Sequence, residues 1–153
     1  SENSDRYNLV LPCLPYTDYL IINELEAGKL TGTAPTPELL PLIAMKLKEL
    51  GVRKKVIIHM PDRSLCCSDE GLTIVPSYDL PKEAIVGTTG AGDAFCAGAL
   101  YGIYRGKTDR EILEFASAAA VAALSSSDAT SGLRTEAEIL EHCKQYRRKG
   151  LCL

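Results

Sequence analysis

The chain alternates between short apolar runs, which are typical of buried strands, and longer segments in which apolar residues recur at helical spacing. Compact apolar runs predict buried strands at residues 19–22 and 55–60. Two further runs, at residues 65–68 and 72–75, flank a short turn that contains Gly71, so they predict a β-hairpin. The strand pattern therefore predicts a sheet with an antiparallel hairpin at one side.

Helices are predicted where apolar stripes follow residues that favour helix starts. Thr36 before Pro37 predicts an N-cap with proline in the first turn, and this helix is expected to end near Gly51. Thr108 and Thr135 each stand three residues before a glutamate, which is the capping-box pattern. The helix after Thr108 is alanine-rich and apolar nearly all round, which predicts burial. Strands that alternate with helices predict an α/β fold with an open three-layer αβα sheet, mainly parallel apart from the hairpin.

Residues 87–98 combine a glycine-rich turn with the start of a helical run that continues to Tyr104. Backbone N–H groups at a helix start have no partner inside the helix, and the helix dipole favours anions there. Gly90 and Gly92 lack Cβ, so the turn can take φ > 0 and admit a phosphate close to the backbone. Asp93 falls beside the first helical turn, where its carboxylate can accept a proton from a hydroxyl. The pattern indicates phosphoryl transfer to an alcohol.

Two better-known phosphate-binding loops do not match this segment. A P-loop needs Lys and then Ser or Thr after its second glycine, and here Asp93 and Ala94 follow Gly92. The dinucleotide-binding fingerprint needs a glycine at the position that Phe95 occupies. The remaining alternative is a glycine-rich turn that merely starts a helix, because short glycine motifs often occur by chance.

Composition narrows the function classes. With 153 residues, of which 46% are hydrophobic and 24% charged, the chain has the size and make-up of one globular domain. A net charge of −3 gives no basic footprint for nucleic acid, and no apolar run approaches membrane-spanning length. The single cationic cluster, Arg147-Arg148-Lys149, is interpreted as a solvated helix end. Neither nucleic acid nor a membrane is therefore expected as a partner.

The cysteines and histidines favour a reduced compartment without a zinc site. The six cysteines show no C-x-x-C pair and no spacing typical of a secreted scaffold, and most lie in apolar stretches. His59 and His142 are too isolated to predict a zinc site. No secretory leader opens the chain, so we expect a cytoplasmic protein. The polar opening at residues 1–5, which lacks Met, is expected for a chain that begins partway through a longer protein.

Residues 87–98 resemble the C-terminal signature of the ribokinase-like (PfkB-type) carbohydrate kinases, in which Thr-x-Gly-Ala-Gly-Asp opens a helix. A second block, Asp18 to Ala27 followed by Leu30-Thr31-Gly32, is similar to that family's strand-Asn-x-x-Glu-Ala segment and its later Thr-Gly. Two motifs in the family's order are more specific than either alone. The resemblance implies that residues 1–153 are the nucleotide-binding C-terminal portion of such a kinase, with the sugar-binding and lid portion absent.

The resemblance also implies roles for individual residues. The implied general base and anion-hole residues are Asp93, Gly90, Ala91 and Gly92. The implied nucleotide contacts are Asn23, Glu26, His59, Thr89 and Ser117. Glu26 is further implied to order Mg²⁺ through water. Two assignments keep a structural alternative, since Asn23 can act as a helix N-cap and Ser117 as a small core residue.

Two positions depart from the family's pattern. After the second strand the family usually carries a Gly-x-x-Gly turn, but this chain has Pro61 and Ser64 at the glycine positions, so the loop cannot take the same backbone. Arg63 in this loop could add a phosphate contact, but it is interpreted as an exposed turn residue. Gly87 stands where the family usually has an Asp that helps to bind a monovalent cation. Without that carboxylate a K⁺ requirement stays open, with nearby backbone carbonyls as the remaining ligands.

For the parent enzyme the resemblance implies ATP- and Mg²⁺-dependent phosphorylation of a sugar or sugar-like hydroxyl. The expected partners are ATP and a sugar or nucleoside, and the full-length protein is expected to be a homodimer. The alternative for the 153-residue chain is a catalytically inactive nucleotide-binding or structural fragment, because the family's sugar-contacting residues lie in the other half.

Overall fold

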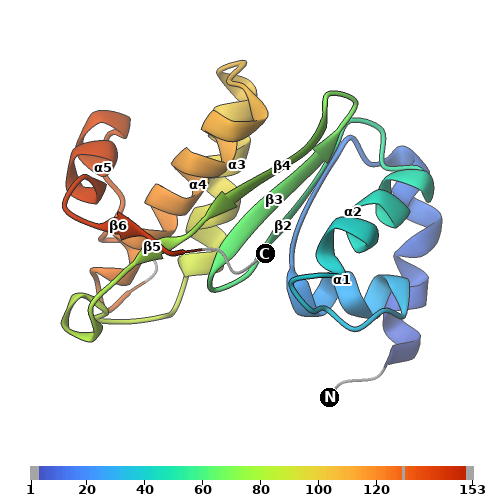
Figure 1. The fold of residues 1–153 in the computed structure, drawn as a ribbon, viewed down its shortest axis with the longest axis horizontal. Coiled ribbons are helices and arrows are strands. Elements are labelled where there is room, and N and C mark those ends of the chain that lie inside the picture. The colour runs from blue at the N-terminus through green and yellow to red at the C-terminus, as the bar shows by residue number, and fades with distance from the viewer. Residues whose placement is uncertain (1–3, 129, 151–153) are drawn as a thin grey trace. The chain divides into compact units, whose positions relative to one another are not determined.

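The computed structural model describes residues 4–128 and 130–150 (Figure 1). These residues form two compact units. The first unit holds the chain up to Met60 together with Leu65–Thr73, and the second holds Pro61–Ser64 and the chain from Ile74 onward. Each unit contains one of the two sequence motifs, residues 18–32 in the first and residues 87–98 in the second.

The first unit places a parallel strand pair beside two helices. Its elements are the 3₁₀ helices η1 (Ser4–Leu9) and η2 (Leu11–Tyr16), strand β1 (Tyr19–Asn23), helices α1 (Glu24–Thr31) and α2 (Leu40–Glu49), and strand β2 (Lys55–His59). Strands β1 and β2 pair in parallel with Asn23 opposite His59, so both strands end at the same edge. Leu40, Ile43 and Leu47 of α2 are fully buried, because they recur at helical spacing on one side.

The sheet contains four strands in the order β1-β2-β3-β4. Strands β3 (Arg63–Ser68) and β4 (Gly71–Pro76) are joined by two residues and form the predicted hairpin, visible in green in Figure 1. Gly71 at the turn has φ +111°, a conformation that L residues rarely adopt. The α/β class, with parallel strands and an antiparallel hairpin, is confirmed.

The second unit is mainly helical. Its elements after β4 are β5 (Tyr78–Asp79), the 3₁₀ turn η3 (Lys82–Ala84), helices α3 (Ala91–Tyr104), α4 (Asp109–Leu124) and α5 (Glu136–Cys143), and strand β6 (Arg147–Arg148). Helices α3 and α4 lie side by side (Figure 1). A Cβ on Gly98 would stand 2.9 Å from Cα of Ala116, so the glycine allows the close helix approach that the small residues predicted.

Helix starts follow the predicted capping chemistry in two of three places. Thr108 and Thr135 cap α4 and α5 in complete capping boxes, as predicted. The predicted cap at Thr36 is wrong, because α2 begins at Leu40 and its N-cap is Leu39, which makes no side-chain capping bond. Pro41 gives the physical reason: it is tolerated in a first turn, whereas a helix that began at Pro37 would place it in the interior.

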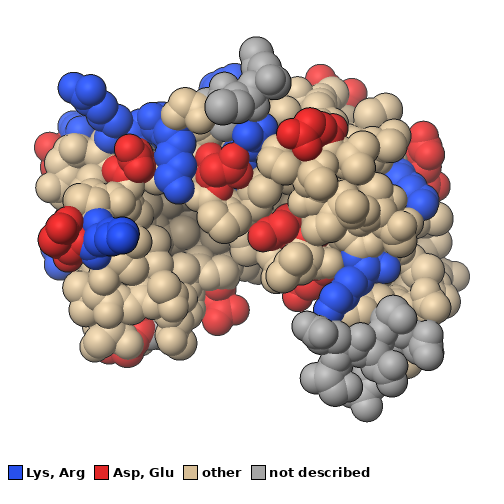
Figure 2. Space-filling view, turned by 60° about the horizontal axis from the view of Figure 1, so that its bottom comes forward, with Lys and Arg blue, Asp and Glu red and all other residues tan. Residues whose placement is uncertain are grey.

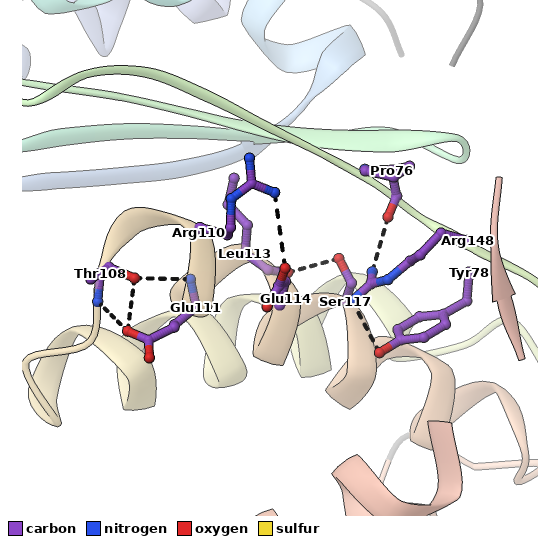
Figure 3. A network of polar contacts seen from close by, with 9 residues as sticks. All are labelled: Pro76, Tyr78, Thr108, Arg110, Glu111, Leu113, Glu114, Ser117 and Arg148. Carbon is purple, nitrogen blue, oxygen red and sulfur yellow. Dashed lines mark hydrogen bonds and ion pairs between the residues drawn. The ribbon is translucent and has the colours of Figure 1, made fainter. Parts of the chain in front are cut away.

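The cationic C-terminal cluster is not a solvated helix end, as the sequence had suggested. Helix α5 ends at Cys143, and Arg147–Arg148 form β6, which pairs antiparallel with β5. The Arg148 guanidinium lies 3.7 Å from the centre of the Tyr78 ring and donates hydrogen bonds to the Pro76 carbonyl and the Tyr78 hydroxyl (Figure 3). The planar arginine guanidinium has five N–H donors, so it can stack on an aromatic ring and donate to two acceptors at once. These contacts favour the pairing of residues 147–148 as a strand over their exposure to solvent at a helix end.

Charged side chains of both signs are interspersed on the face drawn in Figure 2, between larger areas of other residues. Among the residues that the structure describes, no helix combines the length and hydropathy needed to cross a bilayer.

Candidate functional site

Asn23 and Glu26 are held together where β1 passes into α1. The Asn23 side-chain oxygen accepts the Glu26 N–H at 2.9 Å, and the Glu26 carboxylate accepts the Asn23 N–H at 3.0 Å. This is a complete capping box, so Asn23 is the N-cap of α1. The cap leaves the Asn23 amide NH₂ and the second Glu26 oxygen outside these two bonds. Both side chains are thereby oriented at the carboxyl edge of the parallel strands, where open α/β sheets bind ligands.

His59 ends β2 directly opposite Asn23 and is half-buried. Burial lowers the pKa of His59 below its usual 6.5, and the nearby Glu26 carboxylate partly offsets that shift. Desolvation is the larger effect, so the imidazole is neutral at neutral pH. The structure therefore brings Asn23, Glu26 and His59 together in the first unit.

The turn between β2 and β3 differs from the predicted exposed loop at Arg63. Arg63 is the first residue of β3 and only 8% exposed, and it bonds the Asp62 carboxylate through two nitrogens at 2.9 and 3.1 Å. The interpretation as an exposed turn arginine is wrong, because a carboxylate next to it in sequence neutralises the buried guanidinium. The Ser64 hydroxyl and the second Asp62 oxygen have no partner among the described residues.

The glycine-rich segment of the second unit forms a turn at a helix start. Gly90 has φ +82° and is the N-cap of α3 without a side-chain cap. Ala91, Gly92 and Asp93 occupy the first three helical positions, whose N–H groups have no partner inside the helix. We call Gly90–Asp93 the anion turn. Gly92 and Asp93 are exposed, so the donors and the carboxylate are open to solvent.

The other two predicted contacts of the second unit differ in accessibility. Thr89 is exposed and directly precedes the anion turn. Ser117 is 5% exposed, and its hydroxyl donates to the Leu113 carbonyl one turn earlier in α4 at 2.8 Å (Figure 3). This arrangement matches the structural alternative of a small core residue, and an adenine contact by Ser117 stays a prediction.

The chain has a side chain suited to Mg²⁺ at Glu26, but at position 87 it has no side chain that could bind a monovalent cation. Mg²⁺ in nucleotide sites usually keeps several waters and uses one or two carboxylates with the substrate's phosphates, and Glu26 has a carboxylate oxygen outside the capping box. Within the described residues, no group of three His, Cys, Asp or Glu side chains could hold a metal ion by itself. At position 87 the glycine offers no side-chain oxygen as a ligand, and the Ser126 carbonyl stands where a Cβ would project.

Sequence reasoning missed the anchoring of the segment that enters the anion turn. The N–H of Val86 donates to the carbonyl of Leu124, the last residue of α4, at 2.9 Å. No local pattern signals this bond, because the two residues are far apart in sequence. The Ser-Asp-x-Thr-Ser run at 127–131 is a usable signal for the turn that follows α4, where Asp128 accepts backbone N–H bonds.

Comparison with known proteins adds an independent line of observation. The family model described as "pfkB family carbohydrate kinase" matches residues 4–136. Ribokinase of Arabidopsis thaliana is 35% identical over 104 residues, which cover 67% of this chain and 27% of that protein. Adenosine kinase 1 of the same plant is 36% identical over 102 residues, covering 62% of this chain and 30% of that protein.

Solved structures show the same fold. The structure of Arabidopsis thaliana ribokinase in complex with ribose and ATP superposes with a TM-score of 0.74 at 29% identity, and covers 88% of this chain and 43% of that one. A ribokinase-like protein of Escherichia coli, solved with ATP and Mg²⁺, gives a TM-score of 0.76 at 24% identity, with 92% and 44% covered. The chain thus spans about a third of these curated relatives and less than half of these solved chains.

Proposed function

Because the chain belongs to the pfkB family of carbohydrate kinases, we propose that it supplies the nucleotide-binding and proton-accepting part of an ATP-dependent kinase. The acceptor in this proposal is a hydroxyl group of a sugar or a nucleoside. Relatives named ribokinase and adenosine kinase support that acceptor class. Since the chain spans only part of those relatives, the activity belongs to the longer protein that contains these residues.

The observation that carries the proposal is the geometry of the anion turn. A left-handed Gly90 directs the chain into α3 so that three consecutive N–H groups without a partner inside the helix stand beside the exposed Asp93. Donors of this kind stabilise negative charge on a transferring phosphoryl group. A carboxylate at the edge of such a cradle is positioned to accept the proton of an attacking hydroxyl.

In the proposed mechanism Asp93 accepts the hydroxyl proton as the oxygen bonds to the terminal phosphorus of ATP. The bond from that phosphorus to the β,γ-bridging oxygen breaks, and ADP leaves with the electron pair. The N–H groups of Ala91 and Gly92 neutralise charge on the transferring group, and losing one such donor costs about 10²–10³ in rate at comparable sites. Phosphoryl transfer depends mainly on positioning and electrostatics, so no covalent intermediate on the protein is required. When Mg²⁺ is bound, Glu26 would hold it through its water shell, and the ion would offset the negative charge of the phosphates.

The capped edge of the first unit is proposed to hold the nucleotide. Asn23 offers an amide NH₂ to phosphate oxygens, and Glu26 offers its second oxygen to the water shell of Mg²⁺. His59, which is neutral and lies opposite Asn23 at this edge, is proposed to contact the nucleotide without adding charge. Thr89, exposed beside the anion turn, is proposed as a further nucleotide contact.

A second candidate is a nucleotide-binding or structural piece without catalysis. It is favoured by the coverage of the relatives, because residues outside the matched part contribute to the whole kinases. For the 153-residue chain alone we expect no phosphorylation of sugars or nucleosides. Sugar phosphate formed by the purified chain would overturn this second candidate.

The proposal is tested by titrating Mg·ATP into the chain and two glycine variants. Gly90→Ala and Gly106→Ala both force alanine into left-handed backbone, at φ +82° and φ +65°, and a Cβ at 106 meets nothing within 4 Å. Only Gly90 lies in the anion turn. We expect the Kd for Mg·ATP to rise at least about tenfold in Gly90→Ala and to stay unchanged in Gly106→Ala. Equal affinity in all three proteins contradicts the proposal.

A further inference from the structure

The chain segment that enters the anion turn is fixed on the end of α4. Val86 and Gly87 both donate their N–H groups to the Leu124 carbonyl, at 2.9 and 3.4 Å. Leu124 is the last residue of α4, so its carbonyl has no acceptor role inside the helix. The Leu124 carbonyl at the end of α4 therefore accepts two N–H groups from the segment that ends three residues before Gly90.

Gly87 also packs directly on backbone that follows α4. A Cβ at position 87 would lie 2.8 Å from the Ser126 carbonyl oxygen and 3.2 Å from Cα of Ser127. Separations below 3.0 Å are not sustained by real Cβ atoms, and a backbone neighbour cannot rotate aside as a side chain can. The requirement for glycine here is steric, and it is independent of any special φ angle.

The loop that Gly87 contacts is itself held firmly. Asp128 accepts N–H bonds from Thr130 and Ser131 and a hydroxyl bond from Ser131, and these bonds lower its pKa to about 2. Farther along, a Cβ on Gly132 would stand 2.1 Å from the Ala122 carbonyl oxygen. The loop is thus closed on itself and pressed on α4, so it cannot yield to a larger residue at position 87.

We propose that Gly87 is a positioning residue of the anion turn: its contact with the Ser126–Ser127 backbone sets where the N–H groups of Gly90–Asp93 lie. The backbone at Ser126 and Ser127 occupies the space that a side chain at position 87 would need. The position of these N–H groups is a property of the fold. Its effect on phosphoryl transfer rests on the proposed function.

The inference is tested on the 153-residue chain by amide NMR with a matched control. Gly102 of α3 also packs on backbone, with Cα of Ile112 3.2 Å from its added Cβ, but it lies at the far end of the helix. We expect Gly87→Ala to shift the amide signals of residues 90–93 strongly, and Gly102→Ala to leave them in place while lowering the melting temperature. Unchanged signals at residues 90–93 in Gly87→Ala overturn the inference.

A second variant covers the case in which Gly87→Ala does not fold. Asp128→Ala releases the loop while Gly87 stays in place, and Asp128 is exposed, so folding is expected to survive. The amide signals of residues 87–92 should then shift although the mutated residue lies more than thirty positions away. If those signals stay fixed, the loop does not position the turn and the inference fails.

A titration of the same proteins with Mg·ATP separates this inference from the proposed function. We expect at least a tenfold higher Kd in Gly87→Ala than in Gly102→Ala. Shifted amide signals without any ATP binding by the unmodified chain would retain Gly87 as a positioning residue and overturn the proposed nucleotide role. ATP binding with equal Kd in both variants would retain the nucleotide role and overturn the inference.

Discussion

Substitutions at Asn23 can separate its structural role from its proposed role toward the nucleotide. The side-chain oxygen caps α1, and the NH₂ of the same amide is proposed to contact phosphate. Asn23→Ala removes both groups. Asn23→Ser keeps a good N-cap oxygen but removes the NH₂, because serine and asparagine are similar as N-caps.

The size of each effect follows from the contacts. Losing an N-cap costs about 1 kcal/mol, which for a chain of this length lowers the melting temperature by about 2–4 °C. Asn23→Ala should show this loss, and Asn23→Ser should show little of it. A hydrogen bond to a charged group contributes about 1.5–3 kcal/mol, so both variants should bind Mg·ATP at least about tenfold more weakly.

The assay pairs thermal melting by circular dichroism with calorimetric titration of Mg·ATP. Thr135→Ala is the matched control, because it removes a complete capping box from α5 without touching the first unit. It should lose the same stability as Asn23→Ala and keep full ATP affinity. If Asn23→Ser binds Mg·ATP as tightly as the unmodified chain, Asn23 is a cap only and its nucleotide role is refuted.

Three further predictions concern pH, the C-terminal strand and cations. Burial lowers the pKa of His59, so as pH falls past about 6.5 the unfolded chain takes up a proton that the folded chain does not. The free energy of unfolding should therefore decrease from about pH 7 to about pH 5.5. Urea titrations should show a flatter pH profile in His59→Gln, and a profile identical to that of the unmodified chain would refute the pKa shift. Arg148→Ala removes two hydrogen bonds and the stack of the guanidinium on the Tyr78 ring. Denaturant unfolding should show the free energy of unfolding of the second unit lowered by about 2 kcal/mol, whereas a loss below about 0.5 kcal/mol would show that β6 contributes little. Since Gly87 offers no carboxylate, the Kd for Mg·ATP should be equal in KCl and in tetramethylammonium chloride at the same ionic strength, and tighter binding in KCl alone would contradict this expectation.

Local signals in the sequence predicted the local parts of the fold. The capping boxes at Thr108 and Thr135 and the turn before Gly71 each depend on residues within a few positions of one another, and the structure contains all three. The failure at Thr36 is also local, because Pro41 moved the helix start by three residues.

Long-range pairings could not be predicted in this way. The two-residue strands β5 and β6 are too short to show a periodic pattern, and Arg148 meets Tyr78 across 70 positions of sequence. The burial of Arg63 likewise depends on where β3 begins, since Arg63 is the first residue of that strand and its guanidinium pairs with the partly exposed Asp62 carboxylate.

The candidate site shows the same division. The sequence favoured a nucleotide contact for Asn23 and kept an N-cap as the alternative; the structure contains the cap, and the nucleotide contact stays a prediction. The glycine-rich motif predicted the anion turn, because Gly90 can adopt the left-handed backbone that leads into α3. The contact between Gly87 and the Ser126 carbonyl depends on packing between distant segments, so only the structure revealed it.

The most direct test of the proposed chemistry measures turnover and nucleotide affinity together in the full-length protein that contains these residues. Asp93→Asn removes the proposed proton acceptor but keeps its size, and Asp79→Asn is the matched control at an exposed aspartate of the same unit. With a panel of sugars and nucleosides as acceptors, we predict that Asp93→Asn lowers kcat by about 10²–10⁴ and leaves the Kd for Mg·ATP within about twofold, while Asp79→Asn changes neither. Turnover by Asp93→Asn close to that of the unmodified enzyme would contradict the central claim that this carboxylate accepts the hydroxyl proton.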